Sequence, residues 1–171
     1  MQPTLDKSSV ALTQEAFISA IGNCVTGVTV VATDGPGGQY GMTVSSMSSV
    51  SAEPPLLMIC LHRSSLLCQA IAENRHFSVN VLSEEQKTVA QIFAGQVKTH
   101  DRFAHGDWSP GLTRSPRLAG AVACFECQLH SQFELGSHRV LVGEALGVQS
   151  NPLAPLAWQA RQFVLVQSDM R

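Results

Sequence analysis

The chain has 171 residues, of which 44% are apolar and 14% are charged, and its formal net charge is −2. This length fits one domain with a real core, the low charged share argues against disorder, and the lack of a basic stripe argues against a nucleic-acid partner. No apolar run reaches the roughly 18 residues of a membrane span, so a membrane partner is not expected either.

The predicted elements follow a loose polar arm over residues 1–12, and residues 13–171 are expected to form a single domain. Capping residues and apolar spacing predict short helices at 13–21, 64–74 and 84–93. Alternating or continuous apolar residues predict strands at 28–33, 40–46, 54–61, 76–82, 121–131, 139–148 and 162–166.

One of these strands and one loop carry further expectations. Residues 54–61 are a continuous apolar run, which is typical of a strand buried on both faces. Residues 96–119 are polar and rich in turn residues, and a loop of that length is often functional. Strands dominate and occur in clusters rather than in regular alternation with helices. The sequence therefore predicts a mainly β fold, an antiparallel barrel with peripheral helices, and not a doubly wound parallel sheet.

The five cysteines are expected to be free thiols in a cytoplasmic protein, because they lie in apolar surroundings and no signal peptide is recognisable. Cys124 and Cys127 form a CxxC motif, but it lies inside a predicted strand. Residues three apart on a strand point to opposite faces, so the two sulfurs should diverge. We interpret them as core or interface residues and expect no metal site.

The strongest signal is the run GMTVSSMSSVSAEPPLLMICLHRSS, from Gly41 to Ser65. On a strand, Thr43 and Ser45 would face one way and their neighbours the other, so their hydroxyls could line a flat heteroaromatic ring. The serines that end the run stand at a predicted helix start beside an arginine, which is a natural phosphate site. An N-cap serine and a β-bulge explain the same pattern without a ligand, and the residues alone leave both interpretations open.

Several motifs occur together in a fixed order: TGVTVVAT, the Gly41–Leu61 run, RSS, FSVNVLSEEQ, GSHRVLVGE and PLAW. In this order they resemble the flavin reductase-like family, the short NAD(P)H:flavin oxidoreductases that serve as reductase components of two-component monooxygenases. The resemblance covers about residues 16–166. It implies a flavin-binding split β-barrel, usually a homodimer with the flavin near the subunit interface.

The resemblance also implies roles for individual residues. Contacts with the isoalloxazine ring are expected from Thr43, Val44, Ser45 and Ser46. The ribityl phosphate would be held by Ser64 and Ser65, with Arg63. Near the flavin chain or its phosphate we expect Asn80 and either Lys98 or Arg102. His138 would meet the nicotinamide nucleotide and is the candidate catalytic residue, and Trp158 would offer a stacking face where the family often has tyrosine. Ser137 stands where the family often has aspartate.

The implied activity is hydride transfer from NADH or NADPH to FMN or FAD, with reduced flavin passed to a partner monooxygenase. The cofactors carry this chemistry, which explains why the sequence shows neither a nucleophile nor an acid–base pair. Two alternatives stay open. One is a flavin-binding electron-transfer or sensing module without reductase activity, and the other is a reductase of a different acceptor, such as a cobalt corrinoid or a ferric complex.

Overall fold

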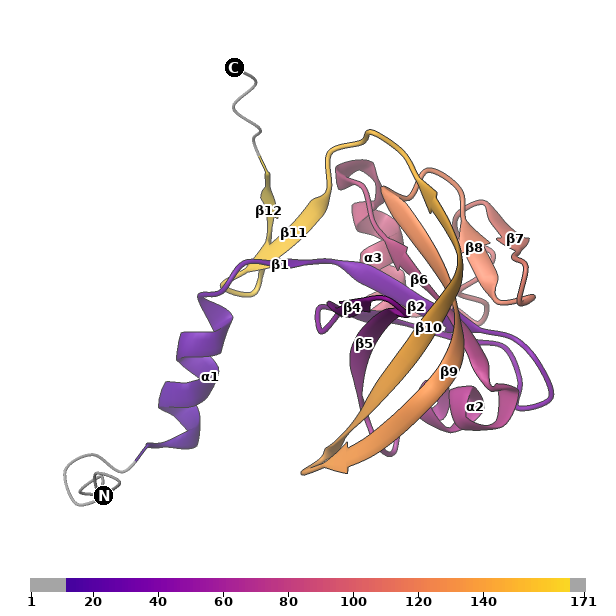
Figure 1. Ribbon diagram of the computed structural model, residues 1–171. Coiled ribbons are helices and arrows are strands. Elements are labelled where there is room, and N and C mark those ends of the chain that lie inside the picture. The colour runs from indigo at the N-terminus through magenta and orange to yellow at the C-terminus, as the bar shows by residue number, and fades with distance from the viewer. Residues whose placement is uncertain (1–11, 167–171) are drawn as a thin grey trace, which may run out of the picture.

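A seven-stranded antiparallel sheet dominates the computed structural model, which describes residues 12–166 (Figure 1). Its order is β3-β2-β6-β9-β10-β5-β4. The strands are β2 (Thr29–Thr33), β3 (Tyr40–Val44), β4 (Ser48–Ala52), β5 (Pro55–His62), β6 (His76–Val81), β9 (Ala123–Leu135) and β10 (His138–Ser150). The predicted antiparallel, mainly β fold is confirmed. Apart from Leu12, the predicted N-terminal arm lies outside the described residues.

The sheet curls into a barrel that is open between its two edge strands, β3 and β4. These strands follow one another in the chain, yet each pairs on one side only. Beside the barrel lie two small sheets, one of β1 (Thr26–Gly27), β11 (Leu156–Gln159) and β12 (Gln162–Leu165), the other of β7 (Trp108–Pro110) and β8 (Pro116–Leu118). Of these strands, only β12 was predicted. The opening leaves one side of β3 without a strand partner in the described part of the chain.

The helices are α1 (Gln14–Gly22), α2 (Leu66–Asn74) and α3 (Lys87–Phe93), and a 3-10 turn, η1 (Glu84–Gln86), precedes α3. Local capping explains where they begin. Thr13 and Ser65 each accept a hydrogen bond from the amide three residues on, at 3.1 and 3.2 Å. Gln86 accepts one from the Ser83 amide at 3.1 Å, which completes a capping box. None of the helices in the described part of the chain is long and apolar enough to cross a membrane.

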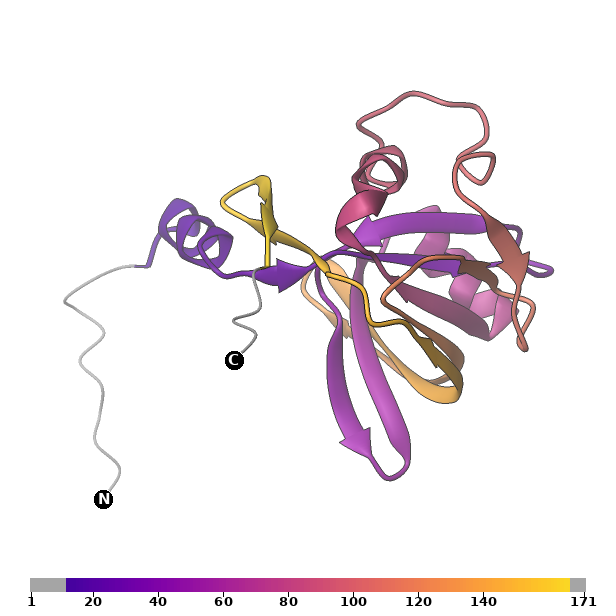
Figure 2. The ribbon, with the colours of Figure 1, turned by 90° about the horizontal axis from the view of Figure 1, so that it is seen from above.

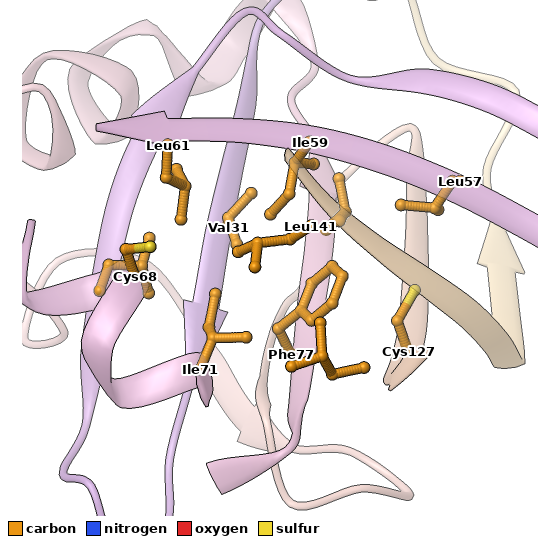
Figure 3. Close-up of a cluster of buried hydrophobic side chains, with 12 residues drawn as sticks. Val31, Leu57, Ile59, Leu61, Cys68, Ile71, Phe77, Cys127 and Leu141 are labelled. Carbon is orange, nitrogen blue, oxygen red and sulfur yellow. The ribbon is translucent and has the colours of Figure 1, made fainter. Parts of the chain in front are cut away.

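Two apolar clusters lie on the two faces of β2, because adjacent residues of a strand point to opposite faces. Val31 belongs to the larger cluster, inside the barrel, with side chains from β5, β6, β9, β10 and α2 (Figure 3). Val30 belongs to the second cluster, which includes side chains of α3, β8 and β11. All five residues of β2 are buried as a result. Strand β2, which is packed on both faces, therefore holds its sheet neighbour β3 in place.

The prediction that β5 is buried on both faces was wrong. Leu57, Ile59 and Leu61 are buried, whereas the residues between them are only partly covered. Helix α2 packs with the first set in the larger cluster. Side chains alternate along a strand, so one helix covers one face only.

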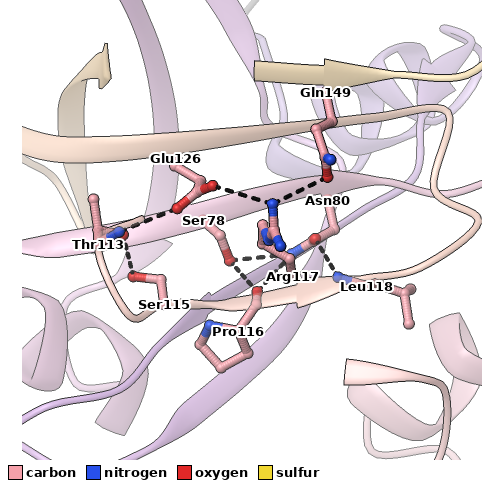
Figure 4. A network of polar contacts seen from close by, with 9 residues as sticks. All are labelled: Ser78, Asn80, Thr113, Ser115, Pro116, Arg117, Leu118, Glu126 and Gln149. Atoms are coloured by element: carbon pink, nitrogen blue, oxygen red, sulfur yellow. Dashed lines mark hydrogen bonds and ion pairs between the residues drawn. The ribbon is translucent and has the colours of Figure 1, made fainter. Parts of the chain in front are cut away.

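The predicted loop over 96–119 contains the β7–β8 ribbon, which buried polar groups hold against the sheet (Figure 4). Asn80 accepts a hydrogen bond from the Leu118 amide at 2.9 Å, and Ser78 donates one to the Pro116 carbonyl at 2.5 Å. The Glu126 carboxylate accepts one from the Thr113 amide at 3.1 Å. The ribbon thus depends on partners far along the chain.

The CxxC cysteines lie on β9, and both are buried free thiols, as predicted. Cys127 packs in the larger apolar cluster, whereas Cys124 lines a separate cavity with residues of the 118–121 turn. Burial raises the pKa of each thiol to about 12. A thiol with so high a pKa carries little thiolate at neutral pH and is a poor nucleophile or metal ligand.

Candidate functional site

Strand β3 lines two adjoining cavities. Thr43, Val44 and the following Ser45 line the first cavity, and Tyr40, Gly41 and Met42 line the second. The opposite wall of the first is formed by Ala90, Ala94 and Gln96, and that of the second by residues 99–103. The two cavities therefore follow one edge strand, with α3 and the segment after it on the other side.

The first cavity is bounded by two aromatic rings from the β11–β12 hairpin. Trp158 and Phe163 meet edge to face, with ring centroids 4.9 Å apart, and both line the cavity. The Thr43 hydroxyl donates a hydrogen bond of 2.7 Å to the Ala90 carbonyl, which fixes α3 against β3. Because β3 is an edge strand, backbone amides and carbonyls on its outer side have no strand partner within residues 12–166. The cavity thus combines flat apolar walls with a row of polar backbone groups.

The second cavity lies at the N-terminus of α2, where it is lined by Ser65, Leu66 and Leu67. The Arg102 guanidinium lines it as well and donates to the carbonyls of Gly41 at 3.3 Å and Phe93 at 3.4 Å. A helix N-terminus and a guanidinium both favour a bound anion. The two cavities together form a trough along β3, and the end of this trough at α2 therefore suits a phosphate.

Gly41 allows β3 to lie flush against aromatic side chains. A methyl group at this position would come within 2.6 Å of the Phe93 ring and 3.1 Å of the Phe103 ring. These two rings and Trp108 form a mutually packed cluster, with centroid distances of 5.1 to 5.2 Å. The spacing between β3 and the segment around Phe103 thus depends on a residue without a side chain.

His138, the predicted catalytic residue, begins β10 at an exposed rim of the barrel. It is the register partner of His62, the last residue of β5, and the two imidazole rings meet edge to face at 5.5 Å. The Ser137 hydroxyl lies 2.9 Å from Nδ1 of His138. The rim also holds Arg139, whose guanidinium contacts Glu134 at 2.6 Å and lowers the pKa of that carboxyl.

The structure brings most of the predicted site residues together. Thr43, Val44, Ser45 and Trp158 line the first cavity, and Ser65 and Arg102 line the second. Arg63, Ser64 and His138 lie at the rim, where the Arg63 amide donates to the Ser137 carbonyl at 3.1 Å. The rim is continuous with the second cavity, because Ser65 directly follows Ser64.

Three predicted residues lie neither in the cavities nor at the rim. Asn80 is fully buried, and its amide group is bonded to the Val30 carbonyl and the Leu118 amide, so it holds the β7–β8 ribbon instead. The Ser46 hydroxyl donates to the Cys60 carbonyl at 2.9 Å and accepts from the Cys60 amide at 3.1 Å, which joins the end of β3 to β5. Lys98 is exposed and lines neither cavity.

Sequence reasoning missed several lining residues. Ala90 and Ala94 lie four apart on one side of α3 and its end, a spacing of small residues that could have marked a helix face beside a ligand. Phe163 and Tyr40 carry no such local signal, because their position depends on sheet pairing. In residues 12–166, no three histidine, cysteine or acidic side chains are grouped as a metal site.

Comparison with known proteins agrees with this fold and site. The family model described as "Flavin reductase like domain" matches residues 21–166. The chain is 37% identical over 138 residues to the FMN reductase (NADH) RutF of Ancylobacter novellus. The aligned residues make up 81% of this chain and 76% of that protein. The chain therefore belongs to the flavin reductase-like family.

Solved structures show the same similarity. The NADH:FAD oxidoreductase SgcE6 of Streptomyces globisporus, in complex with NAD and FAD fragments, superposes with a TM-score of 0.86 and 32% identity, over 92% of this chain and 95% of its own. BorF, the flavin reductase component of a bacterial two-component tryptophan halogenase, has a TM-score of 0.83 and 29% identity, over 91% and 99% of the two chains. These likenesses extend over almost the whole described chain.

Replacement of Gly41 by alanine tests the close packing of β3. The added methyl group would overlap the Phe93 ring, so we expect the free energy of unfolding to fall by about 1–3 kcal/mol. Chemical denaturation followed by tryptophan fluorescence measures it. Gly22→Ala is the matched control, because a methyl group there would meet nothing within 4 Å. Equal stability of the two variants would contradict the packing described for Gly41.

Proposed function

We propose that this protein is a flavin reductase that transfers hydride from a nicotinamide nucleotide to FMN or FAD and supplies reduced flavin to a partner monooxygenase. The observation that carries the proposal is the pair of cavities along β3, one flat and apolar with aromatic walls, the other suited to an anion. A flavin has the same two parts, a planar ring system and a phosphate. Family membership supports the same conclusion.

The residues present fit such a ligand. Thr43 to Ser45 would face the ring system with backbone and hydroxyl groups, and Trp158 would cover it with an apolar face. Ser65 and Arg102 would hold the phosphate beside the α2 N-terminus. When bound, the flavin supplies the redox chemistry, and the chain supplies binding and orientation.

His138 would meet the nicotinamide nucleotide at the rim. Two reactants held in a productive geometry can lower a barrier by about 7–11 kcal/mol in the best cases, without an acid or base from the protein. We infer NADH as the donor, since the names of RutF and SgcE6 both specify it. NADPH is the alternative donor, to be tested beside it.

We also propose that the protein is a homodimer. Helix α1 projects from the barrel next to the β11–β12 hairpin (Figures 1 and 2), and no residue of α1 is buried. Phe17, Ile18 and Ile21 are each about half exposed, at 55%, 47% and 57%. An apolar helix face of this kind usually marks an interaction surface. A second copy of the chain would cover it.

The cytoplasmic location is likewise proposed here. Cys24, Cys60, Cys68, Cys124 and Cys127 are all free thiols, which supports a reducing compartment. Fractionation of the native cell tests it.

The activity is tested by oxidation of NADH and NADPH, followed by their absorbance, with and without added FMN or FAD. We expect turnover that depends on flavin, added or retained from purification. Flavin binding without turnover would favour an electron-transfer or sensing module, and no flavin-dependent rate with either nucleotide would overturn the enzyme proposal.

Replacement of both Ser64 and Ser65 by alanine tests the phosphate end of the site. We expect the Kd of FMN to rise more than that of riboflavin, because only FMN carries a phosphate; each lost hydrogen bond to a charged group is worth about 1.5–3 kcal/mol. Ser65 also caps α2, so Thr13→Ala, which removes the cap of α1, is the matched control. A similar loss of affinity for both flavins would refute the assignment.

The dimer is tested by the molar mass in solution from light scattering. We expect twice the 18.3 kDa of one chain, and a single-chain mass for Phe17→Asp combined with Ile21→Asp, because two buried charges would oppose association. Leu112→Asp is the control, because Leu112 is an exposed apolar residue in the turn between β7 and β8. A monomeric wild-type protein would contradict the proposal.

A further inference from the structure

His62 links the two ends of the proposed site, although neither its sequence context nor the cavities single it out. It is the last residue of β5, and its register partner on the neighbouring strand is His138, the first residue of β10. The two rings meet edge to face, with centroids 5.5 Å apart. Both side chains are exposed at the rim, and this contact restrains the direction of the His138 ring from the neighbouring strand.

The other contacts of His62 lead to the serines at the start of α2. Its Nδ1 lies 2.8 Å from the Ser64 hydroxyl and accepts a hydrogen bond from the Ser64 amide at 3.3 Å. Its backbone carbonyl accepts one from the Ser65 amide at 3.0 Å. Because the Ser64 amide donates to Nδ1, this nitrogen carries the lone pair of the neutral ring. The ring therefore orients Ser64 as well as His138.

A second bridge closes the arrangement. The Arg63 amide donates to the Ser137 carbonyl at 3.1 Å, and the Ser137 hydroxyl contacts Nδ1 of His138 at 2.9 Å. The β5–α2 turn and the β9–β10 turn are thus joined twice, once through backbone and once through the two imidazole rings.

We propose that His62 is a positioning residue that fixes His138 and the Ser64–Ser65 turn at the start of α2 in one arrangement. The inference rests on the proposed function, which assigns His138 to the nicotinamide nucleotide and Ser65 to the phosphate. An imidazole suits both tasks, since its flat ring packs edge to face and its Nδ1 accepts a hydrogen bond. Phenylalanine can do only the first, and asparagine only the second. Two single substitutions therefore separate the two contacts.

The experiment compares His62→Asn and His62→Phe with the wild type. It measures the KM and kcat for NADH, the equilibrium Kd of NADH from its fluorescence, and the Kd values of FMN and riboflavin. His130→Asn is the matched control, because His130 is an exposed histidine on β9 outside the proposed site, 3.9 Å from Glu144. Circular dichroism confirms that each variant is folded.

We expect His62→Asn to raise the KM and Kd of NADH by about 2- to 12-fold, because it removes the contact between the two aromatic rings. The kcat and the ratio of the FMN and riboflavin Kd values should stay close to those of the wild type. His62→Phe should keep the NADH constants and should raise the Kd of FMN relative to riboflavin by about 2- to 12-fold, the worth of one hydrogen bond. His130→Asn should change neither.

Equal effects of the two substitutions on both ligands, or no effect on either, would overturn the inference. Failure of the proposed function is distinct, because it would appear in the wild type as flavin binding without NADH oxidation. The equilibrium Kd values for NADH and for the two flavins still test the positioning role in that case, since they require no turnover.

Discussion

The open edge of β3 is the feature on which the rest of the site depends. One side of this strand pairs with β2, whose residues are all buried, and the other side has no strand partner in the described chain. Thr43 and Arg102 hold α3 and the following segment at a fixed distance from that edge, through hydrogen bonds to the Ala90 and Gly41 carbonyls. The trough is therefore the space left where a barrel does not close.

This arrangement explains why the site needs few charged groups. A strand edge already offers amide donors and carbonyl acceptors in a regular row, and a helix N-terminus offers amides to an anion. Aromatic rings from the β11–β12 hairpin and from the 103–108 segment supply the apolar surfaces. Such a site binds by shape and backbone polarity, which suits a protein proposed to release its reduced flavin to another enzyme.

Local features of the structure could be predicted from sequence, and features that depend on distant partners could not. The helix starts at Thr13, Ser65 and Ser83 follow from capping rules that involve residues three apart. Ser46 and Asn80 have the same chemistry as the polar residues that line the cavities, yet their partners, Cys60 and Leu118, lie 14 and 38 residues away and place them in the scaffold.

Strands that depend on distant partners could not be predicted from the sequence either. The β7–β8 ribbon is three residues long on each side and rests on buried groups of β6 and β9, so its own sequence reads as a loop (Figure 4). The contact between His62 and His138 depends on the register of β5 and β10, which no local pattern encodes. The resemblance to a family implied which residues contact each ligand. The contacts among His62, Ser64 and His138 at the rim could be seen only in the folded structure.

A crystal structure of the protein with FMN tests the central claim most directly. The account predicts the ring system between Thr43–Ser45 and Trp158, and the phosphate beside Ser65 and Arg102 at the start of α2. Density for the ring system away from β3, for example in the cavity that Cys124 lines, would contradict it.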